Sequence, residues 1–406
     1  MDILPILATL RRHKTASGLI VLQVALTCAI VCNALFLISQ RLERIAEPSG
    51  MADEELVLFN VSGLSKSQDP VAATRADLVT LRGLPGVKSV AIINQLPYGD
   101  NFWASGMRLL PDQNAEGVGV ANYFAGEGWL QTTGLRLLAG RDFTNDEYQE
   151  QSTLDESAVR KIPAVIINQA LAKRLFPKGD AVGQTVYVDG PEPLRVVGVL
   201  DTLLSPNPGG EGEHERFTMM LPVRPSYSSG VYMVRVDPAQ REAVLSAGAA
   251  ALEKLDARRI VREKRHFIDT RDNYYRQDRN MAWLMGAVCL ALLLVTSFGI
   301  VGLASFWVQQ RTRMIGTRRA LGATRGQILR YFQTENFLLT SLGIVLGMSA
   351  AYGISLLLMK SYELPRLPWA YLPVGAVLLW ALGQIAVLAP ARRAAALPPV
   401  AALRGN

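Results

Sequence analysis

Charged residues are scarce in this sequence and unevenly distributed. They make up 19% of the 406 residues, whereas about a quarter is usual in a soluble protein. Four windows contain no Asp, Glu, Lys or Arg at all, namely 15–40, 280–310, 336–359 and 367–391. A helix needs about 20 apolar residues to cross the hydrocarbon core of a bilayer, and each window is long enough. The missing charge therefore predicts four membrane-spanning helices.

Motifs for nucleotide hydrolysis and hydrolytic catalysis are also missing. The sequence has no GxxxxGK[ST] phosphate loop, so we expect no ATP hydrolysis by this chain itself. It has neither GxSxG nor HExxH. The three histidines, at positions 13, 214 and 266, match no zinc-binding spacing. We therefore predict no catalytic residue, no metal site and no cofactor bound by this chain.

The segment between the first two predicted spans contains no cysteine, and the predicted spans contain no charged residue. All three cysteines (Cys28, Cys32 and Cys289) lie in predicted spans, which excludes a disulfide in the segment between the first two spans. Cys28 and Cys32 are spaced i, i+4, which leaves a metal or redox pair open. The favoured interpretation is that both are small side chains packed in an apolar helix. The span interiors hold no ionisable group, so a proton or ion relay is disfavoured.

The first predicted span is interpreted as an uncleaved anchor. Its apolar run of about 20 residues exceeds the length of a signal-peptide core, and no small-x-small cleavage site follows before Gln40. Ahead of it, residues 1–14 combine spaced leucines with Arg11, Arg12 and Lys14. This pattern predicts a cytoplasmic amphipathic segment on the membrane surface.

Positive charge is concentrated on one side of the predicted membrane. Residues 1–14, the segment 311–335 and the tail 392–406 together carry a net charge of +10 and fall on the same side if each window crosses once. By the positive-inside rule that side is the cytoplasm. The formal charge of +7 is thus a topology signal, and no nucleic-acid partner is expected. The prediction is a multi-pass membrane protein with both termini cytoplasmic.

The 239 residues between the first two spans, 41–279, have the composition of a soluble domain, with 28 basic and 32 acidic residues. Apolar strands and helices at about 50–115 and again at 216–270 suggest two βαβ-like halves of one split unit. The insert at about 116–215 is richer in strands and turns. We predict an integral membrane α-helical protein with a large α+β extracytoplasmic domain. Within it, residues 203–215 are predicted to be a mobile loop.

The segment 311–335, RTRMIGTRRALGATRGQILRYFQTE, is the most distinctive part of the sequence and is called the arginine-rich segment below. Apolar residues alternate with six arginines, and Gly322 interrupts the pattern. We expect an amphipathic helix at the membrane face, a turn at Gly322 and a second helix entering the third span. From the residues alone, binding of anionic lipid and docking into an acidic groove of a cytoplasmic protein are equally good interpretations.

This segment resembles the one that follows the second span in the MacB/FtsX/LolE-type ABC transporter permeases. The tail PARRAAALPPVAALR (390–404) is similar to the end of the same family. YFAGEGWLQTTGLRLLAGRDFTNDE (123–147), followed by 164–190 and 194–200, resembles the MacB-type periplasmic core domain. The ATPase fused to MacB itself is absent, so the resemblance is to a stand-alone permease subunit.

The resemblance implies a fold and a mechanism. Relatives have four spans and an outer domain of porter and sabre subdomains, which here would be the split unit and the 116–215 insert. They dimerise and recruit a cytoplasmic ATPase that binds ATP and Mg²⁺, and whose motion is passed to the periplasmic side. Here the partner copy would be this chain or a paralogous permease, and a periplasmic adaptor and outer-membrane channel are left open. The carried-over ATPase contacts are Arg313, Ile315, Gly316, Arg318, Arg319, Ala320, Leu321, Gly322, Ala323 and Thr324.

Two further sequence features bear on this interpretation. Relatives usually have Glu before the Ile-Gly pair, where this chain has Met314. One polar contact of the coupling element is therefore in doubt. In the third span, Gly343 and Gly347 form a GxxxG motif that predicts close helix packing, within the subunit rather than at a dimer seam.

Two functions remain open at this stage. The first is export or extraction of a drug, peptide, siderophore or lipoprotein by an ABC-driven machine. The second is an FtsX-like regulator whose outer domain activates a cell-wall enzyme without transport. The large outer domain favours the first, because FtsX proteins carry much smaller ones.

Overall fold

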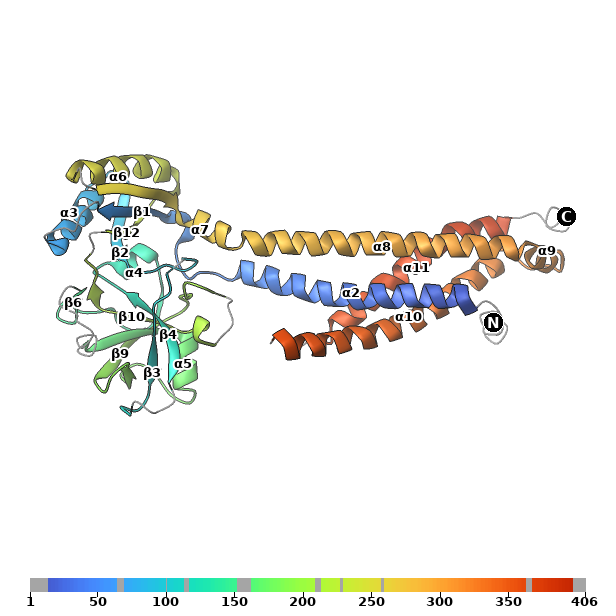
Figure 1. The fold of residues 1–406 in the computed structure, drawn as a ribbon, viewed down its shortest axis with the longest axis horizontal. Coiled ribbons are helices and arrows are strands. Elements are labelled where there is room, and N and C mark those ends of the chain that lie inside the picture. The colour runs from blue at the N-terminus through green and yellow to red at the C-terminus, as the bar shows by residue number, and fades with distance from the viewer. Residues whose placement is uncertain are drawn as a thin grey trace. The chain divides into compact units, whose positions relative to one another are not determined.

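The computed structural model (Figure 1) describes residues 14–63, 69–99, 101–112, 117–151, 162–208, 213–226, 229–256, 259–362 and 367–396. The chain divides into two compact units. One is Ala46–Arg276, and the other combines the segments before and after it. The predicted amphipathic segment 1–14 and most of the tail 392–406 lie outside the described residues.

Four helices of the membrane unit are long and apolar enough to span a bilayer, as the charge-free windows predict. They are α2 (Lys14–Ala46), α8 (Arg276–Gln310), α10 (Arg325–Tyr362) and α11 (Tyr371–Ala396). Each helix extends beyond its window, because the backbone continues to make helical hydrogen bonds through the polar flanks where the apolar signal ends. The prediction of four spans is confirmed.

Helices α2 and α10 approach closely at two glycines of the third span. A Cβ on Gly347 would lie 2.5 Å from Cys28 Cβ and 2.6 Å from the Ala25 carbonyl oxygen. A Cβ on Gly343 would lie 2.8 Å from Val24 Cβ. Such contacts matter because helices in lipid associate through van der Waals packing and hydrogen bonds rather than through a hydrophobic effect.

Polar side chains join α2 to α8 at two levels. Within the bundle, the hydroxyls of Thr27 and Thr296 are 2.8 Å apart. Near the other end, Arg41 forms an ion pair with Asp278. Both cross-links hold the first and second spans together, so a displacement of α8 is expected to move α2 with it.

The outer unit contains a four-stranded antiparallel sheet, which we call the porter-like subdomain. The strand order is β13-β1-β12-β2, and the helices α3 and α6 follow β1 and β12 in the chain. Its core includes Phe59, Leu81, Tyr232 and Leu252. The bounds are β1 (Leu56–Gly63), α3 (Pro70–Arg82), β2 (Val87–Ile93), β12 (Ser229–Val236), α6 (Arg241–Leu255) and β13 (Arg259–His266).

The intervening residues form a small closed barrel, which we call the barrel subdomain. Six strands follow one another as β9-β7-β10-β4-β3-β8, and pairing of β8 with β9 closes the ring. Strand β5 (Leu137–Gly140) adds to the other half of β9. The bounds of the six are β3 (Ala104–Arg108), β4 (Val118–Phe124), β7 (Ala164–Asn168), β8 (Thr185–Val188), β9 (Pro193–Leu200) and β10 (Thr218–Leu221).

Shorter elements complete the outer unit. Two short helices, α4 (Trp129–Thr133) and α5 (Gln169–Leu175), follow β4 and β7. Strands β6 (Gln149–Glu150) and β11 (Val223–Arg224) form a two-stranded sheet. Helix α7 (Phe267–Tyr274) leads directly into α8.

The loop predicted to be mobile at 203–215 is packed at its start. Leu203 and Ser205 are buried. The Leu203 carbonyl accepts hydrogen bonds from Asn168 and Thr218, and the Leu204 carbonyl accepts one from Tyr123. The prediction is wrong for this part, because its proline and glycine content marks the absence of regular structure and not the absence of contacts.

Candidate functional site

The arginine-rich segment folds as a short helix, a tight turn and the start of a long helix. Helix α9 (Thr312–Ala320) ends at Leu321, and Gly322 has a φ of +96°. The Gly322 amide donates to the Arg319 carbonyl and the Ala323 amide to the Arg318 carbonyl. This is the Schellman pattern, in which a left-handed residue, usually glycine, satisfies the last carbonyls of a helix. The turn expected at Gly322 is thus built by the backbone.

Helix α10 starts with a reciprocal cap two residues later. The Thr324 amide donates to Gln327 Oε1 at 2.9 Å, and the Gln327 amide donates to Thr324 Oγ1 at 3.3 Å. A Ser/Thr and a Glu/Gln three residues apart form such a capping box at helix N-termini. The two caps fix the angle between α9 and α10, so the tip between them is a defined shape and not a loose loop.

We expect Thr324→Ala to loosen only this start of α10. The substitution removes the hydroxyl acceptor, at a cost of about 1 kcal/mol. Backbone amides of residues 325–328 should then exchange with deuterium about fivefold faster. Hydrogen-exchange mass spectrometry checks this, with Thr317→Ala on α9 as the control. Unchanged exchange at 325–328 would contradict the role given to the cap.

The predicted contact residues divide into a buried face and an exposed tip. Ile315 and Gly316 are buried, and Ile315 packs with apolar residues of α8, α10 and α11. Arg319 and Ala323 are half-buried. The other predicted residues are exposed, and Leu321 is 83% exposed. They are Arg313, Arg318, Ala320, Leu321, Gly322 and Thr324. The buried face anchors the tip to the bundle.

Two arginines of the tip are held in place by neighbouring helices. Arg319 donates through Nη1 to the Ala395 carbonyl of α11 at 2.7 Å. The Arg318 guanidinium lies 5.0 Å from the centre of the Tyr331 ring of α10. Met314, which stands where relatives have Glu, is partly exposed on α9. The tip therefore presents an exposed leucine and positive charge, and contacts with α10 and α11 hold it in place.

A buried ion pair lies directly behind α9, and sequence reasoning did not single it out. Arg311, at the junction of α8 and α9, donates through Nη1 to both carboxylate oxygens of Glu335 on α10, at 3.0 and 2.8 Å. The two side chains are 8% and 1% exposed. The Arg311 guanidinium also lies 5.6 Å from the Trp307 ring centre. The sequence did contain a signal, since Glu335 is the only acid in the segment.

The arrangement is suited to binding. Among the described residues, no group of three or more His, Cys, Asp or Glu side chains could hold a metal ion. The segment instead combines a rigid basic tip with a buried brace at the end of α8. Such a constellation suits a contact with another protein.

Comparison with known proteins identifies the family of this chain. Residues 19–252 match the MacB-like periplasmic core domain family, and residues 286–399 match the FtsX-like permease C-terminal family. This chain belongs to the MacB/FtsX-type ABC transporter permeases. It is therefore a membrane protein with an extracytoplasmic domain.

Individual relatives share low sequence identity with this permease, but the alignments are long. The ABC transporter permease YknZ of Bacillus subtilis (strain 168) is 26% identical over 361 residues, covering 87% of this chain and 83% of YknZ. The macrolide export ATP-binding/permease protein MacB of Shewanella sp. (strain W3-18-1) is 27% identical over 333 residues. That match covers 78% of this chain and 48% of MacB, so the permease spans about half of that relative.

Solved structures of outer domains are also similar. The crystal structure of the extracellular domain of the ABC-type transporter YknZ from Gram-positive bacteria is 20% identical with a TM-score of 0.32, covering 51% of this chain and all of that domain.

Proposed function

We propose that this permease works with a separate cytoplasmic ABC ATPase, which docks on the exposed tip of α9 and drives a movement of the outer unit. The movement exports or extracts a substrate on the outer side, without passage through the four spans. The single observation that carries the proposal is the continuity of α8. One unbroken helix of 35 residues starts at the outer unit and ends at the braced α9 tip.

Physical reasons favour a push on the tip over simple lipid binding by its arginines. A lipid-binding patch needs basic charge but no fixed shape. Here two caps, a buried ion pair and a buried apolar face fix the tip, and Leu321 projects into solvent beside Arg318. An exposed leucine in an arginine-rich segment suits a groove with an apolar floor and acidic walls. We place this end in the cytoplasm because the basic segments gather there.

The membrane unit is proposed to work as a dimer in the bacterial inner membrane, with this chain or a paralogous permease as the second copy. The outer unit would then be periplasmic and available to an adaptor. Drugs, peptides, siderophores and lipoproteins all fit a permease of this type.

Changes at the tip should separate ATPase binding from membrane insertion. We expect the paired change Arg318→Glu and Leu321→Asp to reduce co-purification of the partner ABC ATPase at least tenfold, since it replaces the apolar contact and reverses a charge. Arg330→Glu is the matched control, because Arg330 is equally exposed on α10 but lies outside the tip. Equal recovery of the ATPase with both variants would contradict the proposed docking site.

A further inference from the structure

The porter-like and barrel subdomains are joined by buried contacts beside β2. Gln95, 4% exposed, follows β2 and binds the barrel backbone on both sides. Its Nε2 donates to the carbonyls of Trp103 and Asn122 at 3.1 and 2.8 Å, and its Oε1 accepts from the Trp103 amide at 2.7 Å. Asn94 adds bonds to Asn122 and Phe124, both at 2.9 Å. Hydrogen bonds of a buried amide such as that of Gln95 are costly to break. We call this contact the pivot.

Arg235 supports the pivot from the porter-like side. Its Nη1 donates at 2.9 Å to the carbonyl of Gln131 in α4, the short helix that follows barrel strand β4 in the chain. Its Nε donates to Glu55 at 2.8 Å. The bond from Arg235 lowers the pKa of Glu55, so this carboxylate stays charged at physiological pH. The Ala52 amide also donates to the Thr133 carbonyl at 2.8 Å. The pivot is therefore a set of short hydrogen bonds in which both backbone amides and backbone carbonyls take part.

A second contact between the barrel and the rest of the outer unit lies at the root of α8. The Tyr274 hydroxyl, at the end of α7, donates to Asn207 Oδ1 at 2.7 Å and contacts the Pro208 carbonyl at 3.0 Å. The Tyr274 ring packs against Tyr98 and Tyr275, with ring centres 5.4 and 5.0 Å apart. This contact ties the barrel to the helix that continues into the membrane unit.

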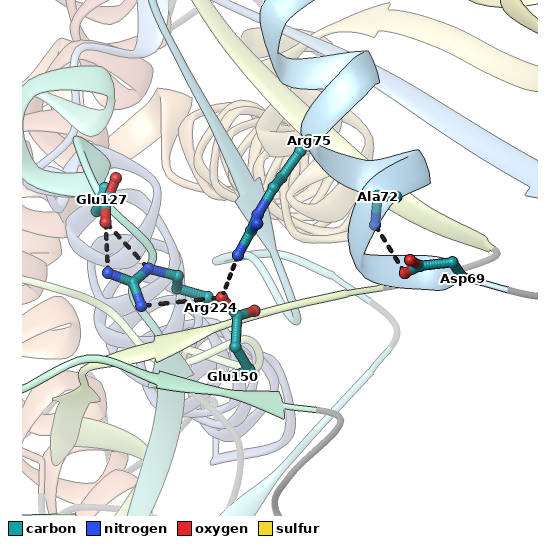
Figure 2. A network of polar contacts seen from close by, with 6 residues as sticks. All are labelled: Asp69, Ala72, Arg75, Glu127, Glu150 and Arg224. Atoms are coloured by element: carbon teal, nitrogen blue, oxygen red, sulfur yellow. Dashed lines mark hydrogen bonds and ion pairs between the residues drawn. The ribbon is translucent and has the colours of Figure 1, made fainter.

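The third contact is of a different kind, because it is ionic and open to water. Arg75 of α3 binds Glu150 of β6 at 2.8 Å, and the Arg75 side chain is 68% exposed. Figure 2 shows Glu150 between Arg75 and Arg224 of β11. In Figure 1, α3 and β6 lie at one end of the outer unit and α7 at the other. We call the Arg75–Glu150–Arg224 group the clasp.

Opening the clasp leaves no charge stranded. Glu150 keeps Arg224, which lies 3.8 Å away, and Arg75 returns to water. Arg224 itself stays fixed by Glu127, with Nη2 and Oε1 2.5 Å apart, and by the Tyr148 ring at 5.0 Å. Exposed ion pairs of this sort contribute little and are screened by salt, whereas the pivot is shielded. The three contacts therefore differ in how easily they break.

We propose that the clasp is a releasable latch, and that the barrel rocks on the porter-like subdomain about the pivot when Arg75 leaves Glu150. Tyr274 ties the barrel to α7, and α7 leads into α8. Rocking of the barrel and displacement of α8 are therefore linked. The latch belongs to this chain alone and needs no ATPase. Its failure in the test below would leave the proposed ATPase partnership standing.

The test measures the distance between the two subdomains in the full chain in lipid nanodiscs. Spin labels replace Lys254 on α6 and Lys178 in the barrel, both exposed, while the native cysteines are buried in the spans. We expect Arg75→Gln to raise the population of longer distances about two- to fivefold, the range for losing one exposed ion pair. Raising NaCl from about 50 to about 500 mM should do the same to the unsubstituted chain and add little to the variant.

Two controls make the outcome decisive. Lys173→Gln removes one exposed charge from the barrel away from the clasp and should leave the distances unchanged. Arg75→Lys, which keeps a positive charge opposite Glu150, should retain part of the short-distance population. The latch is overturned if Arg75→Gln matches the unsubstituted chain at both salt concentrations, or if Lys173→Gln shifts the distances as much as Arg75→Gln does.

Discussion

Replacing Arg311 with Met is expected to lower the free energy of unfolding of the membrane unit by about 3–5 kcal/mol, the range for stranding one member of a buried ion pair. The substitution leaves the Glu335 carboxylate, which is 1% exposed, without the guanidinium that binds both of its oxygens. A charge in that position can reach neither water nor another cation without moving α10. We expect α9 to lose its support as a consequence.

A double-mutant cycle separates this effect from lost packing. Arg311→Met combined with Glu335→Leu gives an apolar pair of similar size, and such replacements are often neutral. The double variant should recover most of the stability in unfolding by SDS titration in mixed micelles. If the single and double variants are equally unstable, the ion pair is not what holds the junction of α8 and α9.

Adding one methyl group at Gly347 is expected to separate α2 from α10. The new Cβ would lie 2.5 Å from Cys28 Cβ and 2.6 Å from a backbone carbonyl, so neither neighbour is the free end of a flexible chain. Overpacking of this kind costs about 1–3 kcal/mol, and backbone contacts place Gly347→Ala at the upper end. SDS titration should report that loss.

Gly353 on the same helix provides a matched control. A Cβ at Gly353 would meet no atom within 4 Å, so Gly353→Ala makes the same chemical change without a clash. Alanine has the higher helix propensity, and the control should be neutral or slightly stabilising. Equal losses from Gly347→Ala and Gly353→Ala would show that the close approach of α2 and α10 does not contribute.

Much of the membrane unit could be predicted because its signals are local. Windows without charged residues indicated the spans, because a charged side chain in the hydrocarbon core of a bilayer is energetically costly. Gly322 marked the turn, because a helix-ending turn depends on residues a few positions apart. The Thr324–Gln327 cap is equally local but was found only in the structure. For the outer unit, the composition of residues 41–279 and their apolar runs predicted a large α+β domain.

The long-range pairings could not be predicted, because periodicity gives the type of an element but not its partner. Nothing in β3 or β8 indicates that they meet and close a barrel. The Arg311–Glu335 pair joins residues 24 positions apart on different helices, and the partner of the GxxxG motif turned out to be α2. The sequence likewise gives no indication that Glu150 pairs with Arg75 of α3.

The measurement that bears most directly on the proposed function is hydrogen exchange of the outer unit in the purified complex with the ABC ATPase. We predict that exchange at α7 and in the Asn207–Pro208 loop changes between Mg·ATP and Mg·ADP, because a push on the tip travels along α8. The change should vanish in the Arg318→Glu, Leu321→Asp variant reconstituted at saturating ATPase. Identical exchange of residues 46–276 in both nucleotide states would contradict the proposal that ATP hydrolysis moves the outer unit.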